Sequence, residues 1–451
     1  MDYVAALRFL RDRAGYDRGF VANPFADEGI GLARTAWLCA VLGDPQQRYR
    51  SVHIAGTKGK GSTAALLTAM LRAAGYRVGL YTSPHLHTLR ERVQIDGQPI
   101  APETFGQLMA ELAEVDARLQ RAHPEWGAAT AFELVTVLAF LAFARAGVDV
   151  GVIEVGLGGR LDATNVILPD VAAITRIGYD HMAILGSTLA AIAREKAGII
   201  KPGRPVVSAP QETEAAAAIE AVAREHGAPL WLGGRDWHVA GNWEQFTFRA
   251  PRWELSGLCS NLRGHHQVEN AGVALATLPW LAERGVTVSE PDIRQGLATA
   301  QWPGRLEVLR ERPLVVADGA HNRESAKRLA GAVRECFRWA RLWLVLGVMR
   351  DKEIERIVAA LAPLADAVFV VERFAPRAAA AERLVAAWQG AAPEKPAWTF
   401  QSVAAALAAA LDQAGPDDLV LVTGSLAMAA GAREALGLAV SDPREHEVLL
   451  G

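Results

Sequence analysis

Short apolar runs alternate with stretches of helical periodicity along most of the chain. In the helical stretches apolar residues recur three and four positions apart, as Leu67, Met70 and Leu71 do. This alternation predicts an α/β fold with a mainly parallel central sheet, because parallel strands need crossover connections that are usually helices. The predicted strands are 52–54, 78–82, 150–155, 171–174, 313–317, 342–346, 367–371 and 419–423.

The same pattern divides the chain into two α/β domains. At roughly 100–200 residues per domain, a chain of 451 residues has room for two or three. Pro303 and Gly304 fix a bend, so residues 298–308 are predicted to form an interdomain linker. The predicted domains are a large P-loop-type domain over 1–297 and a smaller Rossmann-like domain over 309–451.

Two parts of the first domain carry a different pattern. Residues 1–50 are predicted to form helices separated by a polar loop. Residues 204–260 contain tryptophans among alternating polar positions, which predicts a β-rich insert or a sheet edge. The longest apolar stretch, residues 134–144, is predicted to be a buried helix because it is too short to span a bilayer.

Composition narrows the function classes. The net charge is −3 with both signs well mixed, which argues against a nucleic-acid partner, since such proteins are usually basic. Cys39, Cys259 and Cys336 match neither metal nor disulfide spacing, so we expect thiols in a reducing cytoplasm. Arginines interrupt the start of the chain, which predicts no signal peptide, and no membrane partner is expected.

A glycine-rich segment, residues 55–62, joins the first predicted strand to the first predicted helix. Glycines let a backbone curve closely around phosphate oxygens, and a helix N-terminus offers free N–H groups. Lys60 can neutralise phosphate charge, and the Ser62 hydroxyl can contact a metal or a phosphate. The generic phosphate-loop pattern fails because Ile54 replaces its first glycine and Gly61 separates Lys60 from Ser62. A glycine-rich turn is the structural alternative.

Polar residues stand at the carboxyl ends of three predicted strands, the edge where α/β sheets bind ligands. Ser83 precedes Pro84, which cannot continue a regular strand. Glu154 ends a buried strand before a glycine-rich loop, and His181 follows another strand. The structural alternatives are a surface loop at Ser83, a solvated cap at Glu154 and a packing role for His181. The segment 91–93 is predicted to be a short strand.

The buried helix has a capping signal of its own. Thr130 is a candidate N-cap, and Glu133 occupies the capping-box position. Phe132, between them, can stack on a flat ring. A structural role and a substrate-binding role are therefore both open for this segment.

The motifs, taken in order from about Gly31 to about Leu426, resemble the folylpolyglutamate synthase and dihydrofolate synthase family of the Mur ligase superfamily. The segments that carry the resemblance are G-T-x-G-K-G-S from Gly56, Ser-Pro-His-Leu from Ser83, Gly-Leu-Gly-Gly-Arg-Leu-Asp-Ala-Thr-Asn from Gly156, Glu-Lys-Ala-Gly-Ile from Glu195, Gly-x-His-Gln-x-x-Asn-Ala from Gly264 and Asp-Gly-Ala-His-Asn from Asp318. The chain departs from the family pattern at Ala33, Lys58, Met182 and Arg323.

The resemblance implies an ATP-dependent ligase that adds L-glutamate to a dihydropteroate or reduced folate carboxylate through an acyl phosphate. Dihydrofolate synthase and folylpolyglutamate synthase activities are both expected, in a cytoplasmic monomer. The implied cofactors are ATP and two Mg²⁺ ions. The alternatives are another Mur-type ligase acting on a different carboxylate and a non-catalytic nucleotide-binding protein.

The resemblance also assigns residues. Lys196 is implied to carry a carbamate, which is chemically reasonable because a buried neutral amine can add carbon dioxide. The implied catalytic residues are Lys60, Lys196, Arg305 and His321. The implied nucleotide contacts are Thr57, Lys58, Gly59, Lys60, Gly61, Ser62, Asn270, Arg305 and Asp318. The implied metal ligands are Ser83, Glu154, His181 and Lys196. The implied substrate contacts are Thr130, Ala131, Phe132, Glu133, Leu161, Asp162 and Ala163.

Overall fold

The computed structural model describes residues 1–13, 30–251 and 253–445, and the largest sheet in these ranges has eight strands. Six adjacent strands are parallel, and two antiparallel strands complete one edge. The prediction of an α/β fold with a mainly parallel sheet is confirmed. The strands in spatial order are β4 (Gln98–Pro99), β3 (Val93–Ile95), β2 (Val78–Tyr81), β5 (Val150–Glu154), β1 (Arg50–Ala55), β6 (Val171–Ile174), β7 (Val206–Ser208) and β8 (Leu230–Leu232).

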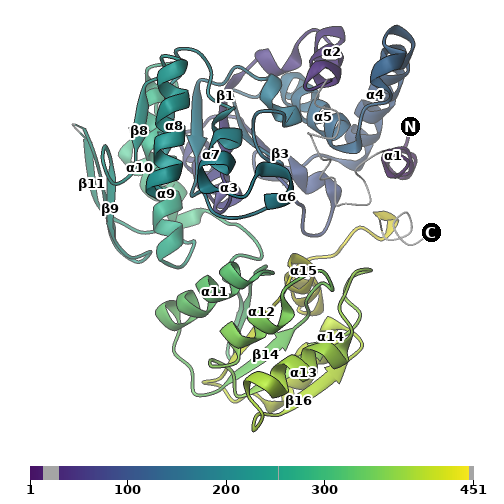
Figure 1. The fold of residues 1–451 in the computed structure, drawn as a ribbon, viewed down its shortest axis with the longest axis vertical. Helices are drawn as coiled ribbons and strands as arrows, with labels where there is room; N and C mark the ends of the chain where they lie inside the picture. Colours follow the sequence, from purple (N-terminus) through teal and green to yellow (C-terminus); the bar gives the residue numbers. More distant parts are fainter. Residues whose placement is uncertain (14–29, 252, 446–451) are drawn as a thin grey trace. The chain divides into compact units, whose positions relative to one another are not determined.

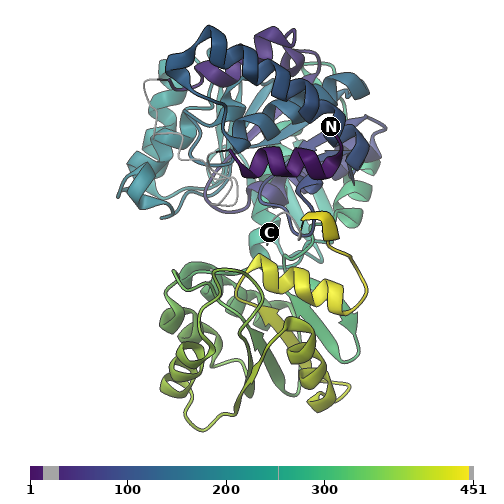
Figure 2. The ribbon, with the colours of Figure 1, turned by 90° about the vertical axis from the view of Figure 1, so that its right-hand side faces the viewer.

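Helices cover this sheet (Figure 1). The central strands are buried on both faces, which is why they appear in the sequence as continuous apolar runs. Helix α3 packs on β1, β2 and β5, and α1 packs against α4 (Figure 2). The helices are α1 (Tyr3–Arg11), α2 (Ala33–Val41), α3 (Lys60–Ala73), α4 (Pro102–Ala122), α5 (Ala131–Ala146), α6 (Met182–Leu185), α7 (Leu189–Ala197), α8 (Thr213–Glu225), α9 (His265–Ala282) and α10 (Glu290–Thr299).

The segment 204–260 contains both of the structures predicted for it. Strands β7 and β8 extend the main sheet, while β9 (His238–Gly241), β10 (Phe246–Ala250) and β11 (Trp253–Leu258) form a separate antiparallel sheet. Helix α8 was not predicted. Its alanine-rich run at 215–218 favours a helix, but the tryptophans that follow dominate the pattern of the segment.

One local prediction is wrong. Residues Leu89–Arg92 form a 3₁₀ helix, η3, rather than the start of a strand, and β3 begins only at Val93. The reason is a capping box, in which Thr88 and Glu91 bond each other's backbone N–H groups. Short 3₁₀ helices also occur at Pro45–Gln47, Pro124–Trp126 and Ala163–Val166.

A six-stranded sheet forms the core of the last part of the chain within the described residues. Five of its strands are parallel, and β12 is an antiparallel edge strand. The strands in spatial order are β12 (Glu307–Glu311), β13 (Leu314–Ala317), β17 (Leu419–Thr423), β14 (Leu342–Leu346), β15 (Ala367–Val371) and β16 (Ala397–Phe400). The helices are α11 (Arg323–Cys336), α12 (Ile354–Leu361), α13 (Ala381–Ala391), α14 (Val403–Gln413) and α15 (Leu426–Ala435).

The described chain forms two compact units whose boundaries interleave in sequence. The first unit contains the described parts of 1–261 and 266–301 together with 443–445, and the second contains 262–265 and 302–442. The chain thus returns to its first unit before the described part ends.

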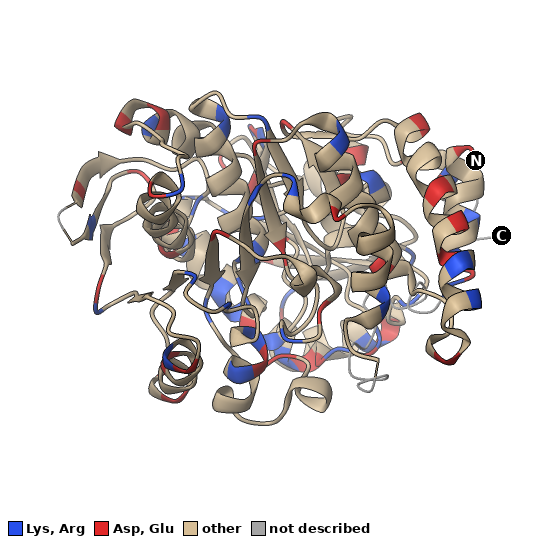
Figure 3. Ribbon diagram, turned by 90° about the horizontal axis from the view of Figure 1, so that it is seen from above, with Lys and Arg blue, Asp and Glu red and all other residues tan. Residues whose placement is uncertain are grey.

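The described part of the chain carries both signs of charge. Acidic and basic positions are interspersed (Figure 3), in keeping with the mixed charge of the sequence. No helix in the described ranges combines the length and hydrophobicity that a membrane crossing requires. Much of the polar loop predicted within 1–50 lies in 14–29, outside the described residues.

Candidate active site

The glycine-rich segment forms a loop between β1 and α3, as the sequence predicts. Gly59 caps α3 with a φ of 93°, and a Cβ built there would lie 2.1 Å from Asn270 Oδ1. Gly56 has a φ of 145°, and its Cβ would lie 1.9 Å from Thr175 Oγ1. Both positions therefore require glycine. The structure brings Asn270, which lies within α9, against the loop.

Hydrogen bonds join this loop to the segment that follows β6. The backbone N–H groups of Thr57 and Lys58 lie 3.1 and 3.3 Å from Arg176 O. Lys58 Nζ donates to Asp180 Oδ2 at 3.0 Å. Burial opposes ionisation of Asp180, but the nearby positive charges, above all Lys58, outweigh it and hold the pKa below its ordinary value. Lys58, a departure from the family pattern, thus already has an anionic partner.

Glu154 ends β5 beside the phosphate loop and is 3% exposed. Lys60 Nζ lies 3.8 Å from Glu154 Oε1, and the Ser83 N–H donates to Glu154 Oε2 at 3.2 Å. Three residues that are distant in the sequence therefore meet at the carboxyl edge of the sheet. The arrangement places one buried carboxylate next to the cation expected to meet phosphate.

The donor set around Glu154 can be tested against magnesium. Within the described residues no group of three or more His, Cys, Asp or Glu side chains could hold a metal. Magnesium does not need such a cage, because it usually binds one or two carboxylates, several waters and substrate phosphates. Glu154 and the Ser83 hydroxyl fit this mode. His181 is half exposed, and partial burial lowers its pKa, which favours the neutral imidazole that binds metals.

Lys196 lies between the phosphate loop and the glycine-rich run after β5. It is 4% exposed, and its Nζ donates to Gly56 O at 3.0 Å. A Cβ at Gly159 would lie 2.7 Å from Lys196 O, so these backbones are in close contact. Burial, reinforced by the charge of Lys60, lowers the pKa of Lys196 to about 7. A substantial fraction of the amine is therefore neutral near pH 7.

Asp162 closes the glycine-rich run and is 2% exposed. Its carboxylate accepts from Leu157 N at 2.9 Å and from Thr164 Oγ1 at 2.5 Å, and burial raises its pKa. The Phe132 ring covers Gly156, where a Cβ would lie 2.4 Å from Phe132 Cζ. Phe132 and Asp162 therefore border the same run, while Ala163 is buried beside it and Leu161 is half-buried.

Sequence reasoning missed His53, which extends the contacts of Asp162. His53 is fully buried in β1, and its Nε2 lies 2.8 Å from Thr164 Oγ1. Burial lowers the pKa of His53 well below its ordinary value, so the ring is neutral. A histidine inside an otherwise apolar strand was the available signal.

The structural role of the Thr130 and Glu133 pair is confirmed. The Thr130 hydroxyl accepts from Glu133 N, and Glu133 Oε2 accepts from Thr130 N at 2.7 Å. Arg34, which the sequence did not single out, donates through Nε to both Glu133 oxygens at 3.1 Å. The carboxylate of Glu133 is thus occupied by protein partners, and Ala131 is fully buried.

Replacement of Arg34 by Met should lower the free energy of unfolding by about 3 kcal/mol, because it leaves a buried carboxylate without its cation. The measurement is the free energy of unfolding from the first transition of a urea titration. Arg145→Met is the matched control, since Arg145 pairs with Glu111 on the surface and is 51% exposed. The control should cost less than about 1 kcal/mol. Equal losses in the two variants would show that the Arg34 pair is not a buried structural contact.

The remaining predicted residues lie in the second unit. Asp318 follows β13, and its two oxygens accept from Leu306 N and Ala320 N, each at 2.8 Å. Arg305 lies beside Gly319, where a Cβ would be 2.6 Å from Arg305 Nη1. His321 Nδ1 lies 2.9 Å from Gly319 O. Arg305, Asp318 and His321 therefore belong to one loop cluster.

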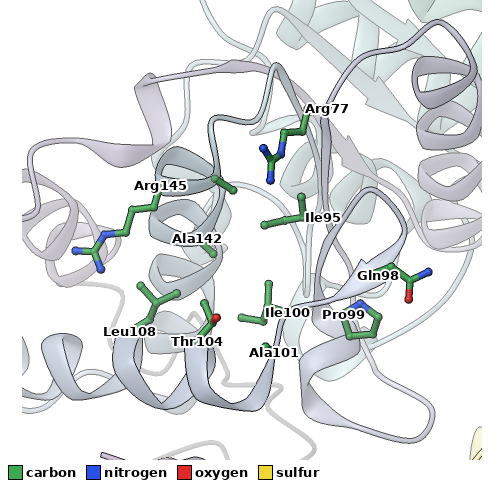
Figure 4. Close-up of a pocket in the computed structure, with 11 residues that line it drawn as sticks. Arg77, Ile95, Gln98, Pro99, Ile100, Ala101, Thr104, Leu108, Ala142 and Arg145 are labelled. Atoms are coloured by element: carbon green, nitrogen blue, oxygen red, sulfur yellow. The ribbon is translucent and has the colours of Figure 1, made fainter.

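A cavity of about 400 Å³ lies elsewhere in the first unit. It is lined mainly by β3, β4, α4 and α5, with Ile95, Ile100 and Leu108 among its apolar residues (Figure 4). Arg77, at its edge, precedes β2, so the cavity lies toward the amino end of that strand, and none of the predicted site residues lines it.

Comparison with known proteins finds two family models that match. Residues 54–278 match the Mur ligase middle domain, and residues 304–426 match the Mur ligase glutamate ligase domain. Dihydrofolate synthase/folylpolyglutamate synthase of Bacillus subtilis is 37% identical over 415 residues, which is 90% of this chain and 95% of that protein. The Escherichia coli protein of the same name is 36% identical over 90% of this chain and 91% of its own length.

Solved structures agree with these matches. Folylpolyglutamate synthase of Mycobacterium tuberculosis, complexed with ADP and AMPPCP, has a TM-score of 0.85 and 33% identity, over 97% of this chain and 99% of that one. Escherichia coli FolC in complex with DHPP and ADP has a TM-score of 0.84 and 34% identity, over 97% of this chain and 98% of that one.

Proposed function

The chain belongs to the folylpolyglutamate and dihydrofolate synthases of the Mur ligase family, and on that premise we propose that it joins L-glutamate to both dihydropteroate and reduced folates. It is an ATP-dependent ligase of folate metabolism. The observation that carries the site assignment is the meeting of Lys60, Glu154 and the Ser83 backbone beside a glycine loop. We propose that it works as a cytoplasmic monomer.

The reaction has two steps. The acceptor carboxylate attacks the γ-phosphorus of ATP, which gives an acyl phosphate and ADP. The amino group of L-glutamate then attacks the acyl carbon, and inorganic phosphate leaves with the bonding electrons. A free carboxylate is a poor acylating group because its oxygen leaves badly, and phosphorylation removes that obstacle. Lys60 offsets the charge on the transferred phosphoryl group, and the N–H groups at the N-terminus of α3 orient the phosphates.

Magnesium would be held by Ser83, Glu154 and His181, with a second ion at a carbamylated Lys196. When bound, magnesium neutralises phosphate charge. Glu154 contributes a buried carboxylate that lies close to Lys60. For the second unit we propose nucleotide contacts for Arg305 and Asp318, and a position near the incoming amino acid for His321.

Around the glycine-rich run we propose acceptor contacts from Phe132, Leu161, Asp162 and Ala163. The Phe132 ring offers a flat apolar surface beside that run. For Thr130, Ala131 and Glu133 the capping box and the Arg34 pair support a structural contribution to the acceptor pocket.

Lys196 should carry a carbamate when the protein is kept in bicarbonate. The neutral fraction of its buried amine supports this reaction, in which Nζ bonds to the carbon of CO₂ and a proton is released. The measurement is a carbon-13 carbamate signal after incubation with labelled bicarbonate. The signal should be absent in Lys196→Ala and unchanged in Lys201→Ala. Lys201 is a suitable control because it is half-buried and burial lowers its pKa to about 8. A wild-type protein without the signal would contradict the assignment.

ADP release with ATP, magnesium and L-glutamate tests the function. Dihydropteroate and tetrahydrofolate are supplied separately, and products are analysed by mass. Glutamate-dependent turnover with both acceptors is expected. Turnover with one acceptor alone would restrict the enzyme to one activity, and turnover with neither would overturn the assignment.

A further inference from the structure

The last described residues of the chain bind the first unit next to its own N-terminus (Figures 1 and 2). Glu445 is 7% exposed. Its carboxylate accepts from Thr88 Oγ1 at 2.5 Å, from Leu89 N at 2.9 and 3.0 Å, and from the Tyr3 hydroxyl. The Arg444 guanidinium lies 5.1 Å from the centre of the Tyr3 ring. These contacts amount to a specific attachment rather than a loose terminal contact.

The attachment point is the capping box of η3. Thr88, which donates to Glu445, is also the residue whose backbone N–H is held by Glu91 at 3.1 Å. The same Glu91 carboxylate accepts from Leu86 N at 2.7 Å and from His87 N at 2.9 Å. Glu445 therefore binds the same turn in which Glu91 fixes the backbone of residues 86–88, and these residues lead back to Ser83.

A second connection runs through Arg92, which is 1% exposed. Its Nε donates to His85 Nδ1 at 3.1 Å. Burial lowers the pKa of Arg92 to about 10, while Tyr81, Glu154 and Glu445 act in the opposite direction and favour its charge. Loss of the Glu445 charge would remove one of the negative charges that stabilise the charged form of Arg92, which donates to His85.

We propose that Glu445 is a positioning residue for the magnesium–nucleotide side of the active site, acting through segment 83–92. The segment begins at Ser83, whose N–H bonds the active-site carboxylate Glu154. By fixing one end of this segment, Glu445 keeps the other end ordered beside the reacting groups. The magnesium–nucleotide role rests on the proposed function, whereas the ordering of the segment is a property of the protein alone.

Hydrogen exchange tests the ordering without any substrate. In the full chain, Glu445→Ala and Glu445→Gln should speed exchange in peptides covering 83–92 by about tenfold, the ratio that corresponds to losing one hydrogen bond to a charged group. Peptides from the phosphate loop at 55–62 should be unchanged. Glu382→Gln, an exposed carboxylate in α13, is the control and should leave both regions unchanged.

Steady-state kinetics tests the positioning. Glu445→Ala should raise the KM for magnesium–ATP by about tenfold and leave kcat and the KM for L-glutamate within about twofold. Glu445→Asp should recover part of the loss, since it keeps the charge. A general loss of folded protein would instead lower kcat without changing either KM.

The outcomes separate the two claims. Unchanged exchange in 83–92 would overturn the inference whatever the enzyme does. Faster exchange with an unchanged KM for magnesium–ATP would overturn the positioning role. A wild-type protein that shows no glutamate-dependent turnover would remove the proposed function, and with it the magnesium–nucleotide role, while the exchange result would still decide whether Glu445 orders the segment.

Discussion

Replacement of Lys60 by Ala should lower kcat/KM for ATP by about 100- to 1,000-fold, the range seen when one preorganised electrostatic group is removed from a transition state. Lys60 is the first residue of α3, directly after Gly59, where a bound phosphate would meet the helix N-terminus. Its Nζ lies 3.8 Å from Glu154 Oε1, which is beyond hydrogen-bond distance, so this pair leaves room for a phosphoryl oxygen beside the amine. Glutamate-dependent ADP release measures the loss.

Lys327→Ala is the control for this experiment, because Lys327 is an exposed lysine of α11 outside the proposed site. It should retain the wild-type rate. A melting temperature within a few degrees of wild type would show that Lys60→Ala is folded. A folded Lys60→Ala enzyme with more than half of the wild-type kcat/KM would remove Lys60 from the catalytic residues.

Replacement of Glu154 by Gln should lower magnesium-dependent turnover by about 100-fold or more, since it removes the buried carboxylate proposed to hold the ion. The amide keeps the size of the side chain and can still accept from the Ser83 N–H. The loss should therefore appear in activity, with a raised magnesium requirement, and far less in stability. Magnesium titration of ADP release is the measurement.

Asp170→Asn provides the matched comparison. Asp170 is also a buried carboxylate of the main sheet, but it precedes β6, at the amino edge, where it accepts from Ser51 N at 3.1 Å. Its replacement should reduce stability without changing the magnesium requirement. If Glu154→Gln and Asp170→Asn had the same kinetic profile, Glu154 would be a structural residue. Retained turnover in Glu154→Gln would remove Glu154 from the proposed magnesium ligands.

Most of the fold could be predicted because its central strands are buried on both faces. Strands such as β5 and β17 are continuous apolar runs in the sequence, which can be recognised without knowing the adjacent strands of the sheet. The 3₁₀ helix at Leu89–Arg92 was harder, because a hydrogen-bonded capping box decided its backbone, not hydrophobicity. Helix α8 was missed although Ala215, Ala218 and Ile219 recur at helical spacing on its buried face, because the tryptophans that follow it dominate the pattern of the segment.

Some residues of the candidate site could be predicted from local sequence, and others could not. Residues attached to local motifs, such as Lys60 in its loop and Glu154 at its strand end, could be found from neighbouring positions. Arg34 could not, because its partner Glu133 is 99 positions away. Glu445 is separated from Leu89 by 356 positions. Contacts of this kind depend on tertiary packing, which no short pattern in the sequence encodes.

The interleaved boundaries of the two units have a consequence for synthesis. A ribosome makes proteins from the N-terminus, and domains usually fold in the order in which they emerge. Here the first unit takes residues 443–445 from the far end of the chain, after the whole second unit has been translated. Nascent chains arrested before that point would have a nucleotide loop but no Glu445 on the turn at Leu89. The segment leading to Ser83 would thus reach its final order only after the second unit has been translated, which makes this contact a late step in the folding of the first unit.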